Sequence, residues 1–108
     1  MELSINDIRE LIGSVDNNAN PNDGIYEVGK NYFIRTVTHY LTGKLQRVGS
    51  QELVLQEAAW IADTGRYADA IKSCDFSEVE PYPPGFLIVG RGSIIDAFQI
   101  TSLPRQQK

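Results

Sequence analysis

The first 13 residues carry apolar side chains at helical spacing. Ser4 and Asp7 resemble a capping box, and the stripe that follows comprises Ile5, Ile8, Leu11 and Ile12. Gly13 ends the pattern, and residues 14–24 are nearly all turn formers. We expect a short amphipathic helix over 1–13 on a flexible tether over 14–24. Because a helix of about two turns is marginal alone in water, its stripe needs cover from its own domain or from another molecule.

After Tyr26 the apolar positions recur with period two, which is typical of strands. Residues 32–40 are rich in β-branched and aromatic side chains, 41–48 alternate in part, and 53–55 continue the pattern. These segments predict a three-stranded antiparallel meander. Gly43 in the second strand indicates strong bending, since a side chain there would collide with a crossing strand.

The second half of the chain predicts one more helix and two more strands. The helix shows apolar spacing at Tyr67, Ala70, Ile71 and Cys74, with Asp63 or Thr64 as its N-cap. Three prolines argue against regular structure over 81–84, and strands follow at 86–89 and 93–100.

Together these elements predict an α+β fold. We expect a small, strongly bent five-stranded antiparallel barrel over 25–102, with one helix inserted before the last two strands and the N-terminal amphipathic helix in front. Residues 103–108 are expected to be a loose tail.

Composition narrows the class of protein. The chain has 108 residues, 42% of them hydrophobic, which suits one folded domain. A net charge of −4 without a basic patch argues against binding of duplex nucleic acid. No apolar run approaches a membrane span, and the N-terminus does not resemble a signal peptide. A single cysteine fits a reducing compartment such as bacterial cytoplasm.

The residues that could carry chemistry favour contact over catalysis. His39 and Cys74 are the only histidine and cysteine, too few for a zinc site, and no motif surrounds them as a catalytic pair. We therefore expect no enzyme activity, metal or cofactor. Trp60 either packs in the core or anchors an interface, and Tyr82 lies in a proline-rich segment that favours a surface contact.

Two glycine-containing segments, 90–93 and 63–66, could bind an anion through backbone N–H groups, although a tight turn and a helix cap are the simpler interpretations. The candidate anion or nucleotide contacts are Arg35, Arg66 and Arg91 for phosphate and Tyr32 for base stacking.

Two motifs resemble the Sm-like barrel family. The family's bent strand pair with a glycine in the second strand is similar to 41–48, and its Arg-Gly strand pair is similar to 88–95. This resemblance implies the barrel topology. The family's RNA contacts are not carried over, because Gly49 and the pair Gln51–Glu52 replace its Asp and Asn.

A second resemblance, over residues 28–98, is to a small, functionally uncharacterised family of tailed bacteriophages and prophages. The matching stretches are Tyr32–Tyr40 with Thr42–Gly43, Ala58–Arg66, Glu78–Pro81 and Val89–Gly92. The family has no assigned activity, so the resemblance implies an origin more than a role.

The sequence thus predicts a non-enzymatic phage or prophage protein that acts as an assembly or interaction module, on the virion as a head-associated or decoration-type subunit, or in the host cytoplasm. The expected partner is a phage structural protein or a second copy of the chain. Its expected contacts are the N-terminal stripe, Trp60 and Tyr82. The alternative is a module that sequesters a host nucleotide signal.

Overall fold

The computed structural model describes residues 25–108. The N-terminal helix and tether expected over 1–24 lie outside this range. The described elements, in chain order, are β1 (Asn31–Thr36), β2 (Tyr40–Val48), β3 (Glu52–Asp63), α2 (Tyr67–Ser73), β4 (Glu78–Pro81), β5 (Phe86–Gly90), the 3-10 turn η2 (Arg91–Ser93) and β6 (Ile94–Ile100).

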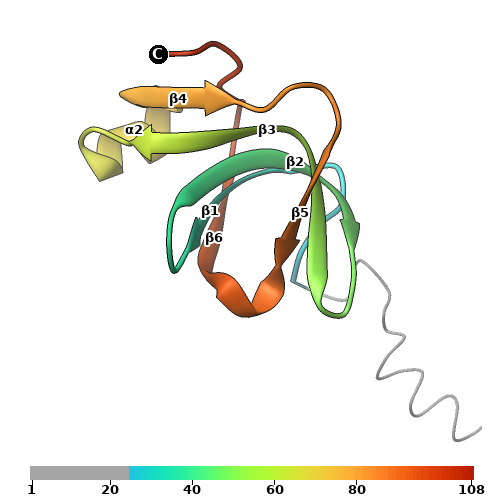
Figure 1. Cartoon of the computed structure of the whole chain (residues 1–108). Helices are drawn as coiled ribbons and strands as arrows, with labels where there is room; N and C mark the ends of the chain where they lie inside the picture. The colour runs from blue at the N-terminus through green and yellow to red at the C-terminus, as the bar shows by residue number, and fades with distance from the viewer. Residues whose placement is uncertain (1–24) are drawn as a thin grey trace, which may run out of the picture.

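All of these strands pair antiparallel in one curved sheet of order β4-β3-β2-β1-β6, with β5 also paired to β3 (Figure 1). On the side opposite β2, the long β3 pairs with two strands. Its residues 52–56 pair with β5, and its residues 59–63 pair with β4. Glu57 lies between the two stretches with a φ of 54°, which marks the point where β3 changes partner.

The expected closed five-stranded barrel is wrong. Among the described strands, β5 pairs with β3 and β6 pairs with β1, and the two do not pair with each other. η2 holds them apart because its ends are tied to different turns. The Arg91 N–H donates to the Gln51 carbonyl at 2.8 Å, and the Val37 N–H donates to the Ser93 carbonyl at 3.0 Å. The result is an open sheet of six strands.

The expected meander and the second helix are both confirmed, as β1–β3 and α2. The predicted cap of that helix is wrong, because the N-cap position is Arg66 and has no side-chain cap. Asp63 instead accepts a hydrogen bond from the Gly65 N–H at 2.9 Å. The short β4 was not predicted, since Pro81 argued against it; as the last residue of a four-residue strand, however, a proline is tolerated.

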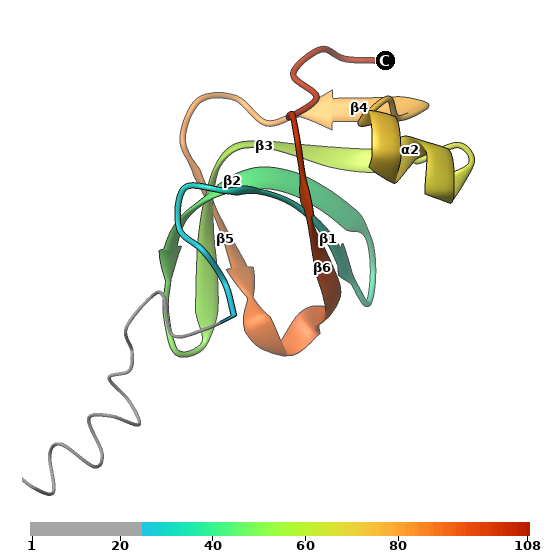
Figure 2. The ribbon, with the colours of Figure 1, turned by 180° about the vertical axis from the view of Figure 1, so that it is seen from behind.

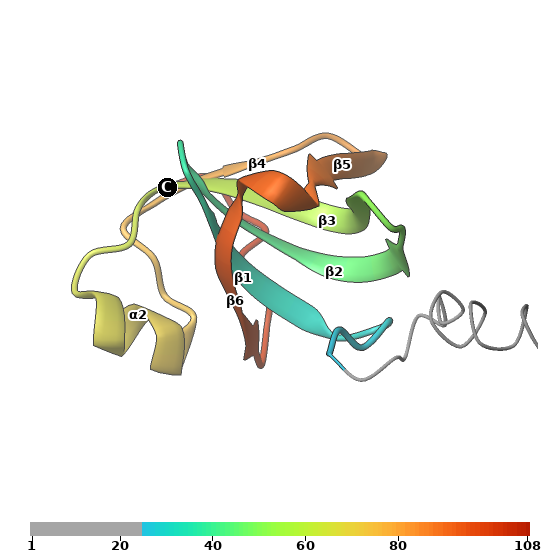
Figure 3. The ribbon, with the colours of Figure 1, turned by 90° about the horizontal axis from the view of Figure 1, so that it is seen from below.

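Two buried clusters pack against the sheet. One cluster fills its concave side and takes Tyr32 and Ile34 from β1, with buried partners Leu41, Leu45, Leu53, Leu55, Ala58 and Val89. The alternate residue Phe33 points to a second cluster, which Phe76 and Ala70 cover from the α2 segment. Phe33 and Phe76 stack with ring centroids 5.5 Å apart. Figure 3 shows α2 to one side of the sheet, away from β5.

The expected collision at Gly43 is confirmed, although the strand involved is the paired neighbour β3 and not a crossing strand. A Cβ on Gly43 would lie 2.9 Å from Cβ of Leu55, a buried residue of the neighbouring β3. Real Cβ atoms do not approach so closely, so the absence of a side chain on β2 allows the tight curvature that encloses the first cluster.

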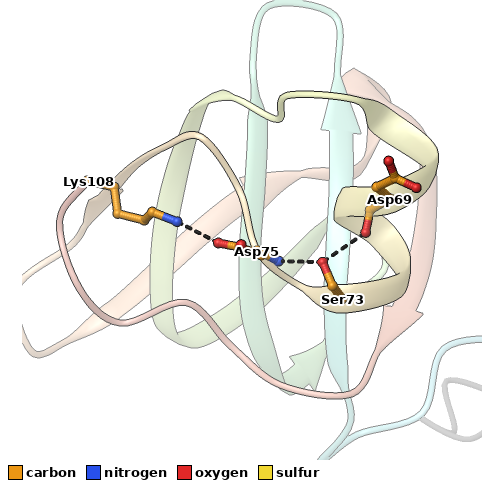
Figure 4. Close-up of polar contacts among 4 residues, drawn as sticks. All are labelled: Asp69, Ser73, Asp75 and Lys108. Carbon is orange, nitrogen blue, oxygen red and sulfur yellow. Dashed lines mark hydrogen bonds and ion pairs between the residues drawn. The ribbon is translucent and has the colours of Figure 1, made fainter.

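The C-terminal segment is anchored rather than loose. Lys108 and Val79 of β4 exchange backbone hydrogen bonds of 3.0 and 3.2 Å. The Lys108 ammonium also pairs with Asp75, whose own N–H donates to Ser73 Oγ at 3.2 Å (Figure 4). Arg105 donates to the Ala58 carbonyl at 2.8 Å. These contacts cover the outer edge of β4.

Across residues 25–108, the helical segments are too short and too polar to traverse a lipid bilayer.

Candidate interaction surface

A shallow groove of about 360 Å³ opens at the β1–β2 turn. One wall is the turn itself and the other is the last part of β3. Figure 2 shows the start of β6 beside this turn. The lining residues are Arg35, Thr36, Val37, Thr38, His39, Tyr40, Trp60, Ile61, Ala62 and Ile95.

Thr36 shapes the turn. Its buried hydroxyl donates to the His39 carbonyl at 2.7 Å and accepts the N–H groups of His39 and Thr38 at 3.0 and 3.3 Å. The Thr36 N–H also donates to the His39 carbonyl at 2.9 Å. The Thr36 side chain thus fixes the shape of the turn, in which Val37 is left exposed.

The rim of this groove is apolar and exposed. Val37 is 70% exposed, Ile95 is 61% exposed and Trp60, the only tryptophan, is 43% exposed. Trp60 pairs with Leu41 of β2, which belongs to the first cluster, so the indole lies on the same, concave face of the sheet as that cluster. Exposed aromatic and aliphatic side chains that meet in a groove favour contact with another apolar surface.

Arg35 also lines the groove, and its guanidinium forms an ion pair with Asp96. Its Nε donates to Asp96 Oδ1 at 2.8 Å and its terminal nitrogen to Oδ2. The hydrogen bonds from Arg35 hold the pKa of Asp96 below its usual value, and those to Asp96 raise the pKa of Arg35. The guanidinium also lies 5.4 Å from the Tyr67 ring centroid. A phosphate at this position would have to displace the Asp96 carboxylate.

The other candidate anion contacts lie elsewhere. Tyr32 is buried, and its hydroxyl accepts the Glu27 N–H at 3.0 Å. Arg91 donates to the Gly49 carbonyl at 2.6 Å and lies over the Tyr26 ring. Arg66 is exposed at the start of α2. The structure therefore does not bring the candidate anion or nucleotide contacts into one pocket.

The candidate partner contacts divide in a similar way. Trp60 lies in the groove, while Tyr82 is half-buried against the first cluster and its N–H donates to the Ala58 carbonyl at 2.9 Å. Ile5, Ile8, Leu11 and Ile12 fall outside the described residues. Between residues 25 and 108 no three histidine, cysteine or acidic side chains gather as metal ligands.

Sequence reasoning missed a second exposed apolar surface, on the outer strands. Phe86 and Ile88 of β5 are 64% and 65% exposed, and Phe98 of β6 is 54% exposed. Phe86 and Ile88 belong to the continuous apolar run 86–89, and Phe98 lies in the strand expected over 93–100. Which side chains of a strand face solvent depends on the pairing, so no sequence signal could identify these three residues as exposed.

No protein-family model matches this chain, and comparison with curated proteins also finds no match. The class that the structure defines is a small, antiparallel, mostly β protein whose described part carries a single α-helix.

Proposed function

We propose that this chain is a non-enzymatic assembly module of a bacteriophage or prophage, which associates with further copies of itself through the outer edges of β5 and β6. The observation that carries the proposal is that, within residues 25–108, each of these strands pairs along one side only and exposes large apolar side chains. The resemblance over residues 28–98 supports the phage origin.

The outer edge of β5 lacks the features that usually protect a free edge. Its five residues, Phe86–Gly90, include no charged residue and no proline. Soluble proteins commonly place lysine, proline or a covering segment at such an edge, because its unpaired N–H and C=O groups invite another strand. The edge of β4, in contrast, is covered by Lys108. The composition of β5 therefore favours a partner strand over solvent.

The positions of the two edges favour a head-to-tail contact. β5 and β6 stand at the opposite ends of the run β5-β3-β2-β1-β6. If β5 of one copy pairs with β6 of the next, both edges are satisfied in every copy of a closed ring, or along an open filament. Repeated identical contacts of this kind suit a multi-copy virion subunit.

The test is the mass of the full-length protein in solution, by light scattering coupled to size exclusion. We expect an oligomer for the unmodified chain and a monomer for both Ile88→Lys and Phe98→Lys, since each places a charge in the interface. The matched control is Val28→Lys, which places the same charge at another exposed apolar position, away from the strand edges, and should leave the oligomer intact.

Mixing the two edge variants tests the pairing itself. Ile88→Lys keeps a native β6 edge and Phe98→Lys keeps a native β5 edge, so an equimolar mixture should form a dimer and nothing larger. A monomeric unmodified chain at high concentration would refute the proposal. Persistence of dimers in one variant alone would refute the head-to-tail arrangement, because it requires β5 to pair with β5 or β6 with β6.

A further inference from the structure

The groove beside Trp60 exposes an apolar surface to which only one of the two proposed edge strands contributes, namely β6 through Ile95. The side chains of residues 25–108 leave Val37, Trp60 and Ile95 exposed around a volume of about 360 Å³. That volume lies within the range of about 300–1,000 Å³ found for pockets that hold small ligands. The groove can therefore accept a few aliphatic side chains.

The chain itself carries such side chains outside the described range. The stripe Ile5, Ile8, Leu11 and Ile12 is aliphatic throughout and spaced for one helix face. A helix of this length is marginal unless its apolar face is covered. The stripe is an apolar face that needs cover, and the groove is an exposed apolar surface that can cover it.

The place where the described chain begins puts the groove within reach. The Arg91 guanidinium lies 5.4 Å from the Tyr26 ring centroid, and Arg91 is four residues before Ile95 at the groove. Even with side chains extended in line, Ile25 and Ile95 are separated by no more than roughly 35 Å at about 3.5 Å per residue. Residues 13–24, between the stripe and Ile25, can span up to about 40 Å.

We propose that the groove formed by Val37, Trp60 and Ile95 is the docking site for the apolar stripe of the same chain's N-terminal segment. A short linker holds its segment at an effective concentration on the order of millimolar, which favours the chain's own segment over that of a second copy in dilute solution. This inference goes beyond the proposed function and does not depend on self-association.

Trp60 is the only tryptophan, so its fluorescence reports on this groove alone. The experiment compares the full-length chain with Ile8→Asp, at low micromolar concentration, by emission maximum and by acrylamide quenching. Docking predicts that Ile8→Asp shifts the emission to longer wavelength and increases quenching, because Trp60 loses its cover. Leu11→Asp should repeat the effect.

The matched control is Asn6→Asp, which adds the same charge on the opposite helix face and should leave both signals unchanged. Circular dichroism confirms that each variant is folded. Repeating the comparison in the Ile88→Lys background separates docking from any effect of self-association on Trp60.

Equal emission and quenching in the unmodified chain and Ile8→Asp would overturn the proposal. The Ile88→Lys variant with a native N-terminal stripe should also give the same emission and quenching at every dilution. A change on dilution would overturn the proposal, because a second copy would then supply the segment. A signal that is independent of dilution and sensitive to Ile8→Asp supports docking within one chain.

Discussion

Replacement of Gly43 by alanine tests whether the curvature of the sheet rests on one missing side chain. The new Cβ would lie 2.9 Å from Leu55 Cβ and 3.1 Å from Leu55 Cδ1. Leu55 is fully buried and its Cβ is fixed to the backbone of β3, so rotation about χ1 cannot relieve the closest contact. Strands β2 and β3 would have to move apart.

The expected size of the effect follows from two opposing terms. Overpacking in a close-packed core costs about 1–3 kcal/mol. Alanine in place of glycine within a strand returns about 0.5–1 kcal/mol, because the unfolded chain loses freedom. The difference spans about 0–2.5 kcal/mol, and its centre is a net loss of about 1 kcal/mol in the free energy of unfolding. With a urea slope of about 1–1.5 kcal/mol per molar, the unfolding midpoint should fall by about 1 M.

The assay is urea unfolding followed by circular dichroism, with Gly90→Ala as the control. Gly90 is a second glycine of this sheet, at the end of β5, but a Cβ there meets no atom of the described chain within 4 Å and its φ is −69°. Gly90→Ala should therefore gain up to about 1 kcal/mol. If Gly43→Ala is as stable as Gly90→Ala, the close approach of β2 and β3 does not exist and the argument fails.

Three further substitutions test other parts of the fold. Arg105→Ala removes the donor to the Ala58 carbonyl, and we expect a loss of about 1 kcal/mol in the urea-derived free energy of unfolding. Asp96→Asn removes a carboxylate whose pKa is lowered by Arg35. In the unmodified chain, the stabilisation from this ion pair should be lost as pH falls below about 4 and the carboxylate is protonated. The melting temperature of Asp96→Asn should therefore depend less on pH in that range. Phe76→Ala empties a buried position in the second cluster and should cost about 3–5 kcal/mol, measured by urea unfolding.

Each of these has a control and a contrary result. Gln106→Ala changes the exposed neighbour of Arg105 and should have no effect. If Arg105→Ala costs no more than Gln106→Ala, the hydrogen bond from Arg105 to the Ala58 carbonyl does not anchor the C-terminal segment. High salt should reduce the acid dependence of the unmodified chain, since the Arg35–Asp96 pair is part-exposed, and identical pH profiles with and without Asp96 would contradict the ion pair. A cost below about 1 kcal/mol for Phe76→Ala would contradict its burial.

Local patterns predicted the meander and α2 because their signals are local. Period-two runs with β-branched residues define strands, and the spacing from Tyr67 to Cys74 defines one helix turn after another. The cap of α2 was missed because Asp63 and Thr64 have side chains typical of an N-cap, whereas the helix begins only after Arg66, which makes no side-chain cap. β4 was missed because Pro81 is unfavourable in a strand interior, whereas its actual place at the strand end is decided by pairing with Ala59.

The candidate site was only partly predictable. Trp60 was identified from its residue type, but Val37 and Ile95 join it only because the β1–β2 turn and the start of β6 meet in space. The arginines were chosen for their charge alone. Arg35 and Arg91 turn out to bind Asp96 and the Gly49 carbonyl, partners that lie 61 and 42 residues away in the chain and that no local spacing reveals.

By itself, the sequence determined the kind and order of β1–β3, α2, β5 and β6 and the need for a bend at Gly43, because these depend on side-chain periodicity and on backbone freedom within a few residues. Tertiary structure alone decided that β3 pairs with both β4 and β5, that the sheet stays open, and that apolar side chains remain exposed on β5, β6 and beside Trp60. Those outcomes depend on which distant strands exchange hydrogen bonds, and alternating residues are equally compatible with either face until that pairing is set.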